Sequence, residues 1–226
     1  MSAIVVAVAA AIGGGKSELV KGLAAALGGT PTIHFDDFEE ATRLAPDQLA
    51  RWIGAGANFD EIAAPGFADA LGALRKNPAC SASDPSVGVV VAEMPLGRSY
   101  PATAGLIDFL IWVDTPLDVA LARNLRSLAA AVPGGEEDAR GFLAWLDSYL
   151  EQYLAQVRVV LDLQRERVAA GADLVLDGLL PPDRLVALAA AAVRDFSVPA
   201  GPDDPPRGPG APPGPKLPSG GIRSRG

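Results

Sequence analysis

The stretch AIVVAVAAAIGGGKS, from Ala3 to Ser17, decides the fold. It opens with a continuous run of alanine, valine and isoleucine, which is typical of a strand buried on both faces of a parallel sheet. Three glycines, Gly13 to Gly15, then break the run, and leucine and valine recur at helical spacing from Ser17 to Leu27. The stretch therefore predicts a strand, a glycine-rich loop and a helix in immediate succession.

Strand and helix patterns alternate along the rest of the chain. Apolar runs predict further buried strands at Thr32–Phe35, Val87–Ala92, Ile107–Val113 and Ala172–Asp177. Apolar residues at helical spacing predict helices at Pro46–Ile53, Gly66–Lys76, Pro116–Ala131, Glu136–Ala169 and Pro182–Arg194. The fourth of these segments is either one long helix or two that abut. Five strands separated by helices indicate an α/β fold, doubly wound in three layers around a five-stranded parallel sheet.

The composition changes sharply near the end of the chain. Residues 198–226 contain nine prolines and seven glycines and almost no large apolar side chains. Such a segment cannot bury enough apolar surface to offset the entropy of ordering, so we expect a disordered tail. Residues 1–197 are then expected to form one domain, which is long enough to bury a sizeable core.

The charge balance limits the class of partner. The formal net charge is −8, and the tail contributes +2 from four basic and two acidic residues, so residues 1–197 carry −10. This argues against a nucleic acid or an anionic membrane as partner. Any anionic ligand must therefore be held by a few local cations.

Single residues and short runs exclude several other classes. Cys80 is the only cysteine and His34 the only histidine, which excludes an intramolecular disulfide, a cysteine zinc cluster and a multi-histidine metal site. Because His34 lies within an apolar strand, we expect it to be packed rather than catalytic. The apolar run that ends at Ile12 is shorter than the ~20 residues of a membrane span, and no basic residue precedes Lys16 as in a secretory signal. We therefore expect a cytoplasmic protein.

The GGGKS segment, Gly13 to Ser17, has the chemistry of a phosphate-binding loop. Glycines let backbone N–H groups curl around phosphate oxygens, and the following helix adds its partial positive charge. Lys16 would reach the β- and γ-phosphates, and the Ser17 hydroxyl would bind Mg²⁺. The full pattern has a glycine at position 10, where this chain has Ala10. The alternative is a glycine-rich turn with an exposed lysine.

Acidic residues follow three of the predicted strands. In a parallel sheet, ligands bind beyond the carboxyl ends of the strands, so such residues are site candidates. Asp36, with Asp37 beside it, is placed to deprotonate an acceptor hydroxyl, and Glu93 is placed to support Mg²⁺ beside Ser17. The alternatives are a helix cap for the aspartate pair and an ordinary polar strand end for Glu93. Asp114 precedes a helix start that contains a proline, and we expect it to be structural.

Arg123 and Arg126 lie three residues apart on a predicted helix and so share a face. They precede the segment from Val132 to Gly135, whose Pro and Gly residues favour a lid. Arginines there would stabilise charge on a transferring phosphoryl group and exclude water. The alternative is a solvated basic face.

The order of these motifs resembles that of the P-loop kinases grouped with uridine kinase, phosphoribulokinase and nicotinamide riboside kinase. Besides the opening stretch, the similar segments are TIHFDDF, Asn58-Phe59-Asp60, VVVAEMPLG, FLIWVDTPLDVALARNLRS and residues 149–178. The resemblance covers roughly residues 3–190 in one order. It implies a P-loop NTPase fold and a P-loop kinase domain at 1–197 that uses ATP and Mg²⁺.

The resemblance also implies residue roles. The first acid of the D-D-F signature, Asp36, would be the general base, and Asp60 would hold substrate hydroxyls such as those of a ribose. Arg123 and Arg126 would belong to the lid, and Gly178 to Pro181 would pass near adenine. The set of candidate substrate-binding residues is completed by Arg98 and Arg158.

The sequence departs from this family at several positions. Besides Ala10, Asn124 and Ser127 stand where members often carry arginines. Uridine kinases insert a base-reading segment with aromatic residues and histidine before the strand that ends in glutamate. Here the corresponding segment, Asn77–Ser86, contains neither. Uridine as substrate therefore does not follow from the resemblance.

The sequence thus predicts a kinase that transfers the γ-phosphoryl group of ATP to a hydroxyl of a nucleoside or another sugar-like metabolite, acting as a monomer or homodimer. Two rivals remain. A regulatory nucleotide-binding NTPase would need the phosphate loop but no base beside an acceptor. A degenerate, non-catalytic homologue would bind a partner through the proline-rich tail.

Overall fold

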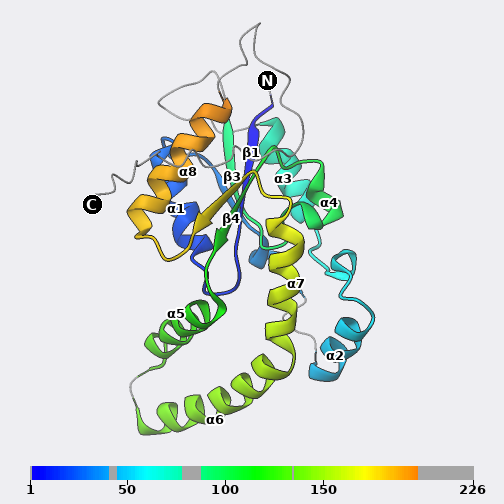
Figure 1. Cartoon of the computed structure of the whole chain (residues 1–226), viewed down its shortest axis with the longest axis vertical. Helices are drawn as coiled ribbons and strands as arrows, with labels where there is room; N and C mark the ends of the chain where they lie inside the picture. Colours follow the sequence, from blue (N-terminus) through cyan, green and yellow to red (C-terminus); the bar gives the residue numbers. More distant parts are fainter. Residues whose placement is uncertain (1, 41–44, 78–87, 134, 198–226) are drawn as a thin grey trace, which may run out of the picture.

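The computed structural model describes residues 2–40, 45–77, 88–133 and 135–197, and its centre is a five-stranded sheet (Figure 1). All the strand pairs are parallel, in the order β2-β3-β1-β4-β5. The strands are β1 (Ile4–Ala9), β2 (Thr32–His34), β3 (Val89–Glu93), β4 (Phe109–Asp114) and β5 (Leu174–Asp177). This confirms the predicted α/β fold with a five-stranded parallel sheet.

Helices cover both faces of the sheet and make three layers. One face packs against α1 (Lys16–Ala26) and α8 (Pro182–Ser197), which lie together on one side in Figure 1. The other face packs against α3 (Phe67–Lys76) and α7 (Arg158–Ala169), and α4 (Pro101–Ala104) lies on the same side as α3 in Figure 1. Short 3₁₀ turns complete the fold at Phe35–Asp37 (η1), Phe59–Glu61 (η3) and Gly97–Ser99 (η4).

The opening apolar run behaves as predicted because its residues alternate between two cores. Val5, Ala7 and Ala9 contribute to the core under α3 and α7, whereas Val6 and Val8 contribute to the core under α1 and α8. All of these side chains are fully buried, as expected for the central strand of a sheet covered on both faces.

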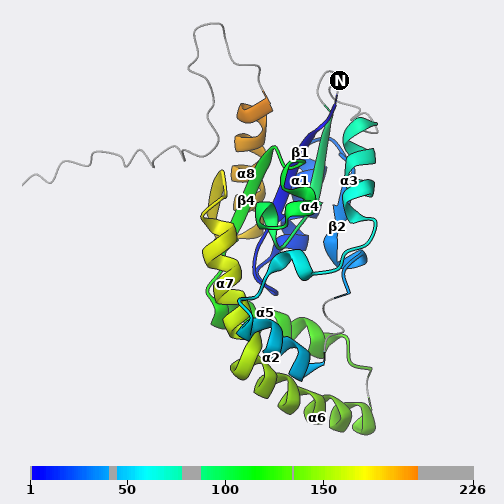
Figure 2. The same cartoon turned by 90° about the vertical axis from the view of Figure 1, so that its right-hand side faces the viewer.

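An arm of helices projects beyond the carboxyl end of the sheet (Figure 2). It consists of α5 (Leu117–Ala130) and α6 (Glu136–Gln152), and α6 continues through a π-helical turn, η5 (Tyr153–Val157), into α7. The long segment predicted from 136 to 169 is therefore two helices that abut through this turn. The helix α2 (Pro46–Gly54) lies beside η5. No helix in the described residues has both the length and the apolar character that a membrane span requires.

Three predictions fall outside the described residues. These are the tail at 198–226, Cys80, and all of the Asn77–Ser86 segment except its first residue. They remain predictions from the sequence. The ends of the described strands and helices differ from the predicted ends by a few residues at most. The helix α4 had no predicted counterpart.

Candidate active site

The loop between β1 and α1 has a backbone that requires glycine. Gly13 and Gly15 adopt positive φ angles of 73° and 97°. A Cβ on Gly13 would lie 2.1 Å from the Ala120 carbonyl oxygen, and a Cβ on Gly14 would lie 2.7 Å from a backbone oxygen of the loop itself. Only a residue without a side chain fits here. Gly15 directly precedes the first turn of α1. The N–H groups of the loop therefore lie at a helix N-terminus, which is where a phosphate loop binds phosphate.

Two buried side chains from distant elements brace this loop. The Thr115 hydroxyl, just after β4, donates to the Gly14 carbonyl at 2.9 Å. The Gln164 amide of α7 donates to the carbonyl of Ala10 at 3.2 Å and to that of Pro95 at 2.8 Å. The sequence reasoning missed both braces. Because each partner lies far away in the chain, no local spacing could have indicated them.

Lys16, Ser17 and Glu93 meet at the carboxyl end of the sheet. The Ser17 hydroxyl donates to Oε1 of Glu93 at 3.0 Å, and Nζ of Lys16 lies 3.5 Å from the same oxygen. Glu93 is 3% exposed, so the carboxylate is buried and paired. The structure therefore brings together the three residues for which phosphate and Mg²⁺ roles were predicted.

The imidazole of His34 completes this cluster from β2. Its Nδ1 lies 2.7 Å from Oε2 of Glu93. The sequence predicted a packed histidine within an apolar strand, and this is wrong, because the side chain is partly open to solvent and bound to the buried acid. β2 is the neighbour of β3 in the sheet, and this adjacency places the two residues side by side.

Asp36 and Asp37 follow β2 within the turn η1. Neither caps the turn η1 itself, because the residue before it is His34 and no side-chain cap bond to it is present. Desolvation raises the pKa of the Asp36 carboxyl above its ordinary value. Lys16 opposes this rise in pKa, whereas Glu93, Glu39 and Asp37 add to it. Asp36 therefore lies within electrostatic reach of the phosphate-loop lysine and of the buried glutamate.

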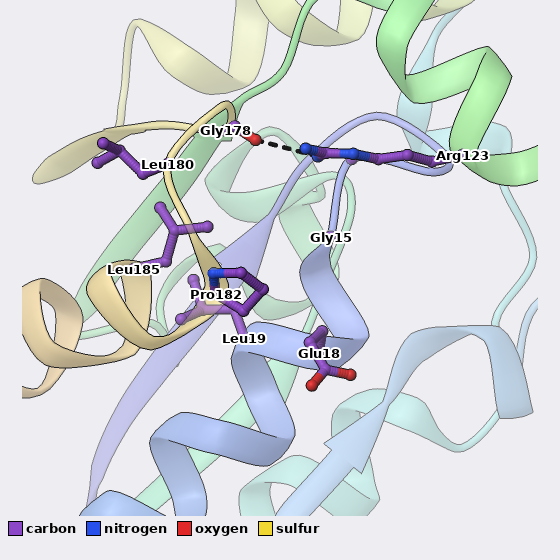
Figure 3. Close-up of a pocket in the computed structure, with 9 residues that line it drawn as sticks. Gly15, Glu18, Leu19, Arg123, Gly178, Leu180, Pro182 and Leu185 are labelled. Carbon is purple, nitrogen blue, oxygen red and sulfur yellow. Dashed lines mark hydrogen bonds between the residues drawn. The ribbon is translucent and has the colours of Figure 1, made fainter.

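A cavity of about 240 Å³ opens between the phosphate loop and the start of α8 (Figure 3). Its lining includes Gly14, Gly15, Arg123, Gly178 and Pro182 together with three leucines. Nη1 of Arg123 donates to the Gly178 carbonyl at 3.0 Å, and this bond forms one wall of the cavity. Apolar side chains and a planar guanidinium suit the faces of a nucleotide base. The prediction that Gly178 passes near adenine is compatible with this cavity.

The contact between Gly178 and Thr115 fixes the position of the cavity relative to the loop. A Cβ on Gly178 would lie 1.8 Å from Oγ1 of Thr115, so the two backbones approach more closely than any side chain allows. The segment after β5, the end of β4 and the phosphate loop are thus packed into one unit.

Arg98 does not lie at the site. Its guanidinium forms an ion pair with Asp173 at 2.7 Å and donates to the carbonyls of Asp108 and Gly171. Asp108 and Asp173 precede β4 and β5, so these partners lie at the amino end of the sheet, opposite the phosphate loop. The prediction of Arg98 as a substrate-binding residue is therefore corrected to a structural role.

Three other candidates lie in exposed positions. Asp60 is exposed on η3, and its N–H donates to the Asn58 side chain. It is not among the charged groups that act on the Asp36 carboxyl. Arg126 on α5 and Arg158 at the start of α7 are also exposed. Their predicted roles, like that of Asp60, depend on a bound ligand and stay predictions.

Asp114 is structural, as predicted, but for a different reason. Pro116 occupies the N-cap position of α5 and no side-chain cap bond is present, so the aspartate does not cap this helix. The Asp114 carboxylate instead accepts from Arg165 at 2.7 Å and from the indole N–H of Trp112 at 3.3 Å. It ties the end of β4 to α7.

Arg167 of α7 supports the segment before η3. It donates to the carbonyls of Ala57 at 2.6 Å and Gly56 at 2.9 Å, and its guanidinium lies 5.0 Å from the ring centre of Phe59. Ala57 has a positive φ of 49°, which is uncommon for a residue with a side chain. The sequence reasoning did not find this support.

The described residues fit a nucleotide and its metal ion in one specific way. They contain no group of three or more His, Cys, Asp or Glu side chains that could hold a metal by itself. Ser17 gives its hydroxyl hydrogen to Glu93, which leaves the oxygen lone pairs available for a cation. A divalent ion would therefore be held by Ser17 and by the phosphates of a bound nucleotide.

Comparison with known proteins gives likenesses in structure alone. No protein-family model matches the chain, and no curated protein matches its sequence. A putative fructose transport system kinase from Silicibacter sp. TM1040 is 19% identical with a TM-score of 0.48, over 77% of this chain and 89% of its own. Shikimate kinase from Aquifex aeolicus is 14% identical with a TM-score of 0.45, over 85% and 97%.

A gluconokinase from Sinorhizobium meliloti 1021 is 16% identical with a TM-score of 0.44, and the match covers 85% of this chain and 93% of that one. At such identities and TM-scores, these likenesses carry nothing about the activity or the acceptor of this chain. The order and direction of its own strands and the geometry of its own loop define the fold.

Proposed function

We propose that the protein is an ATP- and Mg²⁺-dependent small-molecule kinase of the P-loop class, which phosphorylates a hydroxyl of a nucleoside or another sugar-like metabolite. One observation carries this proposal: Asp36 follows the end of β2, where His34 pairs with Glu93, and both Glu93 and Lys16 influence the pKa of its carboxyl. A candidate base and a candidate phosphate-binding lysine therefore share one site, which an NTPase switch without an acceptor would not need.

Each residue of the site has a separate task in this proposal. Backbone N–H groups of the loop from Gly13 to Gly15 and the Lys16 ammonium hold the phosphates and neutralise their charge. Asp36 orients the acceptor hydroxyl and takes its proton as the oxygen attacks. The Mg²⁺ ion, when bound, supplies further neutralisation of the phosphate charge. Most of the rate then comes from positioning and charge stabilisation.

The base of the nucleotide is assigned to the cavity beside Gly178. Arg123 is held by the Gly178 carbonyl at the cavity wall, and the leucine side chains offer apolar contact. In this arrangement the nucleotide spans the glycine loop, with its base on the α8 side and its phosphates toward Glu93. The acceptor then approaches from the side of η1, where Asp36 lies.

A screen of phosphoryl transfer tests the proposal. ATP consumption is measured with and without nucleosides, pentoses, sugar phosphates and small hydroxy acids. The proposal predicts ATP consumption that depends on one class of acceptor and falls about 10²- to 10⁴-fold in Asp36→Asn. Consumption that no acceptor stimulates would favour a nucleotide switch. Failure to bind ATP at all would favour a non-catalytic homologue.

A further inference from the structure

His34 lies beside Glu93 for a reason built into the sheet. It is the last residue of β2, and the parallel register pairs it directly with Glu93, the last residue of β3. Side chains of paired residues point to the same side of a sheet. The distance from Nδ1 to Oε2 is 2.7 Å, and because a carboxylate oxygen only accepts, Nδ1 carries the shared hydrogen.

The two oxygens of the Glu93 carboxylate have separate partners. Oε1 accepts from the Ser17 hydroxyl and faces the Lys16 ammonium, whereas Oε2 accepts from the imidazole. The glutamate is 3% exposed, so water does not replace a missing partner. A planar carboxylate held at both oxygens has one orientation, and that orientation presents Oε1 to the phosphate loop.

His34 itself is not needed to fill the core. Its side chain is 38% exposed, and in the part of the chain that the structure describes its one hydrogen bond is the one to Glu93. The imidazole therefore connects a buried carboxylate to the surface without contributing much apolar burial. A strand position with this exposure would accept many other residues if packing were its task.

We propose that His34 is a positioning residue of the phosphoryl-transfer site, which holds Glu93 so that Ser17 donates its hydrogen to Oε1 and keeps its oxygen free for Mg²⁺. This inference rests on the proposed kinase function, because it assigns Ser17 to the metal ion. His34 does not touch the reacting atoms. It acts through Glu93 and Ser17, in the manner of the outer groups that orient metal ligands.

Nucleotide binding tests this role without catalysis. The affinity for ATP is measured by calorimetry across a series of Mg²⁺ concentrations. Loss of an outer partner of a metal ligand typically costs about 10- to 100-fold in metal affinity or activity, so we expect such a loss of Mg²⁺ affinity in His34→Ala. His34→Asn should restore most of it, because its amide N–H lies near the position of Nδ1. Equal Mg²⁺ dependence in wild type and His34→Ala would overturn the inference, as would an asparagine variant no better than the alanine one.

A double-mutant cycle shows whether His34 acts through Glu93. His34→Ala is combined with Glu93→Gln, and the Mg²⁺ affinity of the ATP complex is measured for all four proteins. If the imidazole works through the carboxylate, its removal costs little once Glu93 is altered. An undiminished loss in the Glu93→Gln background would assign His34 another role.

The nucleotide-free protein offers an independent readout. Because the chain has one histidine, its imidazole ¹⁵N signals need no assignment. We expect the tautomer with hydrogen on Nδ1 in wild type, and its loss in Glu93→Ala. The opposite tautomer in wild type would overturn the inference.

Two outcomes separate this inference from the function on which it rests. A wild-type protein that binds no Mg²⁺–ATP contradicts both. A wild-type protein whose Mg²⁺-dependent ATP binding and acceptor phosphorylation persist unchanged in His34→Ala contradicts the His34 role alone. If the alanine variant melts below the assay temperature, His34→Val gives the same comparison, because valine favours a strand and donates no hydrogen bond.

Discussion

The Thr115 hydroxyl donates a 2.9 Å hydrogen bond to the carbonyl oxygen of Gly14, although 101 positions separate the two residues in the chain. Thr115 is buried and follows β4, and Gly14 is the middle glycine of the phosphate loop. The bond gives a buried loop carbonyl its partner, and it holds the loop against the neighbouring strand.

Replacement of Thr115 by valine tests this bond. Thr115→Val keeps the shape of the side chain but leaves the Gly14 carbonyl without its partner, which typically costs about 1–3 kcal/mol of unfolding free energy. ATP affinity should fall as well, because the loop loses a support. Urea unfolding and nucleotide titration measure the two effects. Thr115→Ser keeps the hydroxyl and is the control; a valine variant as stable as wild type would show that the bond contributes nothing.

Addition of one methyl group at Gly178 should disturb the cavity. The new Cβ would lie 1.8 Å from Oγ1 and 2.9 Å from Cα of Thr115, so rotation of the threonine cannot relieve the clash. We expect Gly178→Ala to lose about 1–3 kcal/mol of stability through overpacking and to bind ATP more weakly. Gly171→Ala, at the other end of β5, is the matched control because its Cβ would meet nothing closer than 3.8 Å. Similar melting temperatures for the two variants would contradict the predicted clash.

The charge of Lys16 is central to the proposed phosphate site. Lys16→Met keeps the length of the side chain and removes the charge, and we expect kcat to fall about 10²- to 10³-fold. The fold should survive, because Glu93 keeps its bonds to Ser17 and His34. Lys21→Met, at an exposed position of the same helix, is the control. If both variants turn over alike, the loop does not bind the transferring phosphate.

The raised pKa of Asp36 predicts a pH profile. The base works only when deprotonated, so kcat/KM should fall as the pH drops through this raised pKa, at a higher pH than for an ordinary aspartate. Lys16 lowers the pKa of Asp36. In Lys16→Met that pKa should therefore be higher, and the residual activity should begin to fall at a higher pH than in wild type as the solution is acidified. Asp37→Asn removes the smallest of the contributions that raise this pKa, so it should move the acid limb only slightly, and to lower pH. An acid limb that Lys16→Met does not move would exclude Asp36 as its source.

The same pKa shift has a consequence for stability. Because the pKa of Asp36 is raised in the folded state, the folded chain holds the proton more tightly than the unfolded chain. Ionisation of Asp36 therefore weakens the fold above the raised pKa, and this cost disappears as the pH falls below the ordinary value. Asp36→Asn should be more stable than wild type at neutral pH, with a difference that shrinks in acid. Chemical denaturation at several pH values measures it, and a variant less stable at neutral pH would contradict the shift.

The sequence predicted the sheet well because the relevant signal is local. A buried parallel strand appears as a continuous apolar run, and the strands, the glycine loop and the long helical segment were all found in this way. Gly13 to Ser17 and Glu93 could be placed at one edge of the sheet because parallel strands all end there. The catalytic and ligand-binding roles of these residues stay predictions.

Contacts between distant segments could not be predicted. His34 was expected in the core because the sequence does not show that β2 pairs with β3, and that pairing alone places its imidazole on Glu93. Arg98 was predicted as a substrate-binding residue, and the sequence does not show which partners its guanidinium reaches. The chain turns back after β3, and the long arginine side chain reaches the opposite edge of the sheet. The exposure of residues along the helices could likewise not be predicted, because it depends on which elements pack against each helix.

The braces of the loops around the site have implications for evolutionary change. Thr115, Gln164, Arg123 and Arg167 all donate to main-chain carbonyls rather than to side chains. Every residue type carries such a carbonyl, so a mutation at Ala10 or Ala57 does not remove the accepting group, whereas the accepting positions Gly14 and Gly178 have no room for a side chain. Ala10, which stands where the loop pattern has glycine, still offers its carbonyl to Gln164. Drift in the loop side chains can therefore alter what the site recognises while the scaffold that holds the loops stays in place.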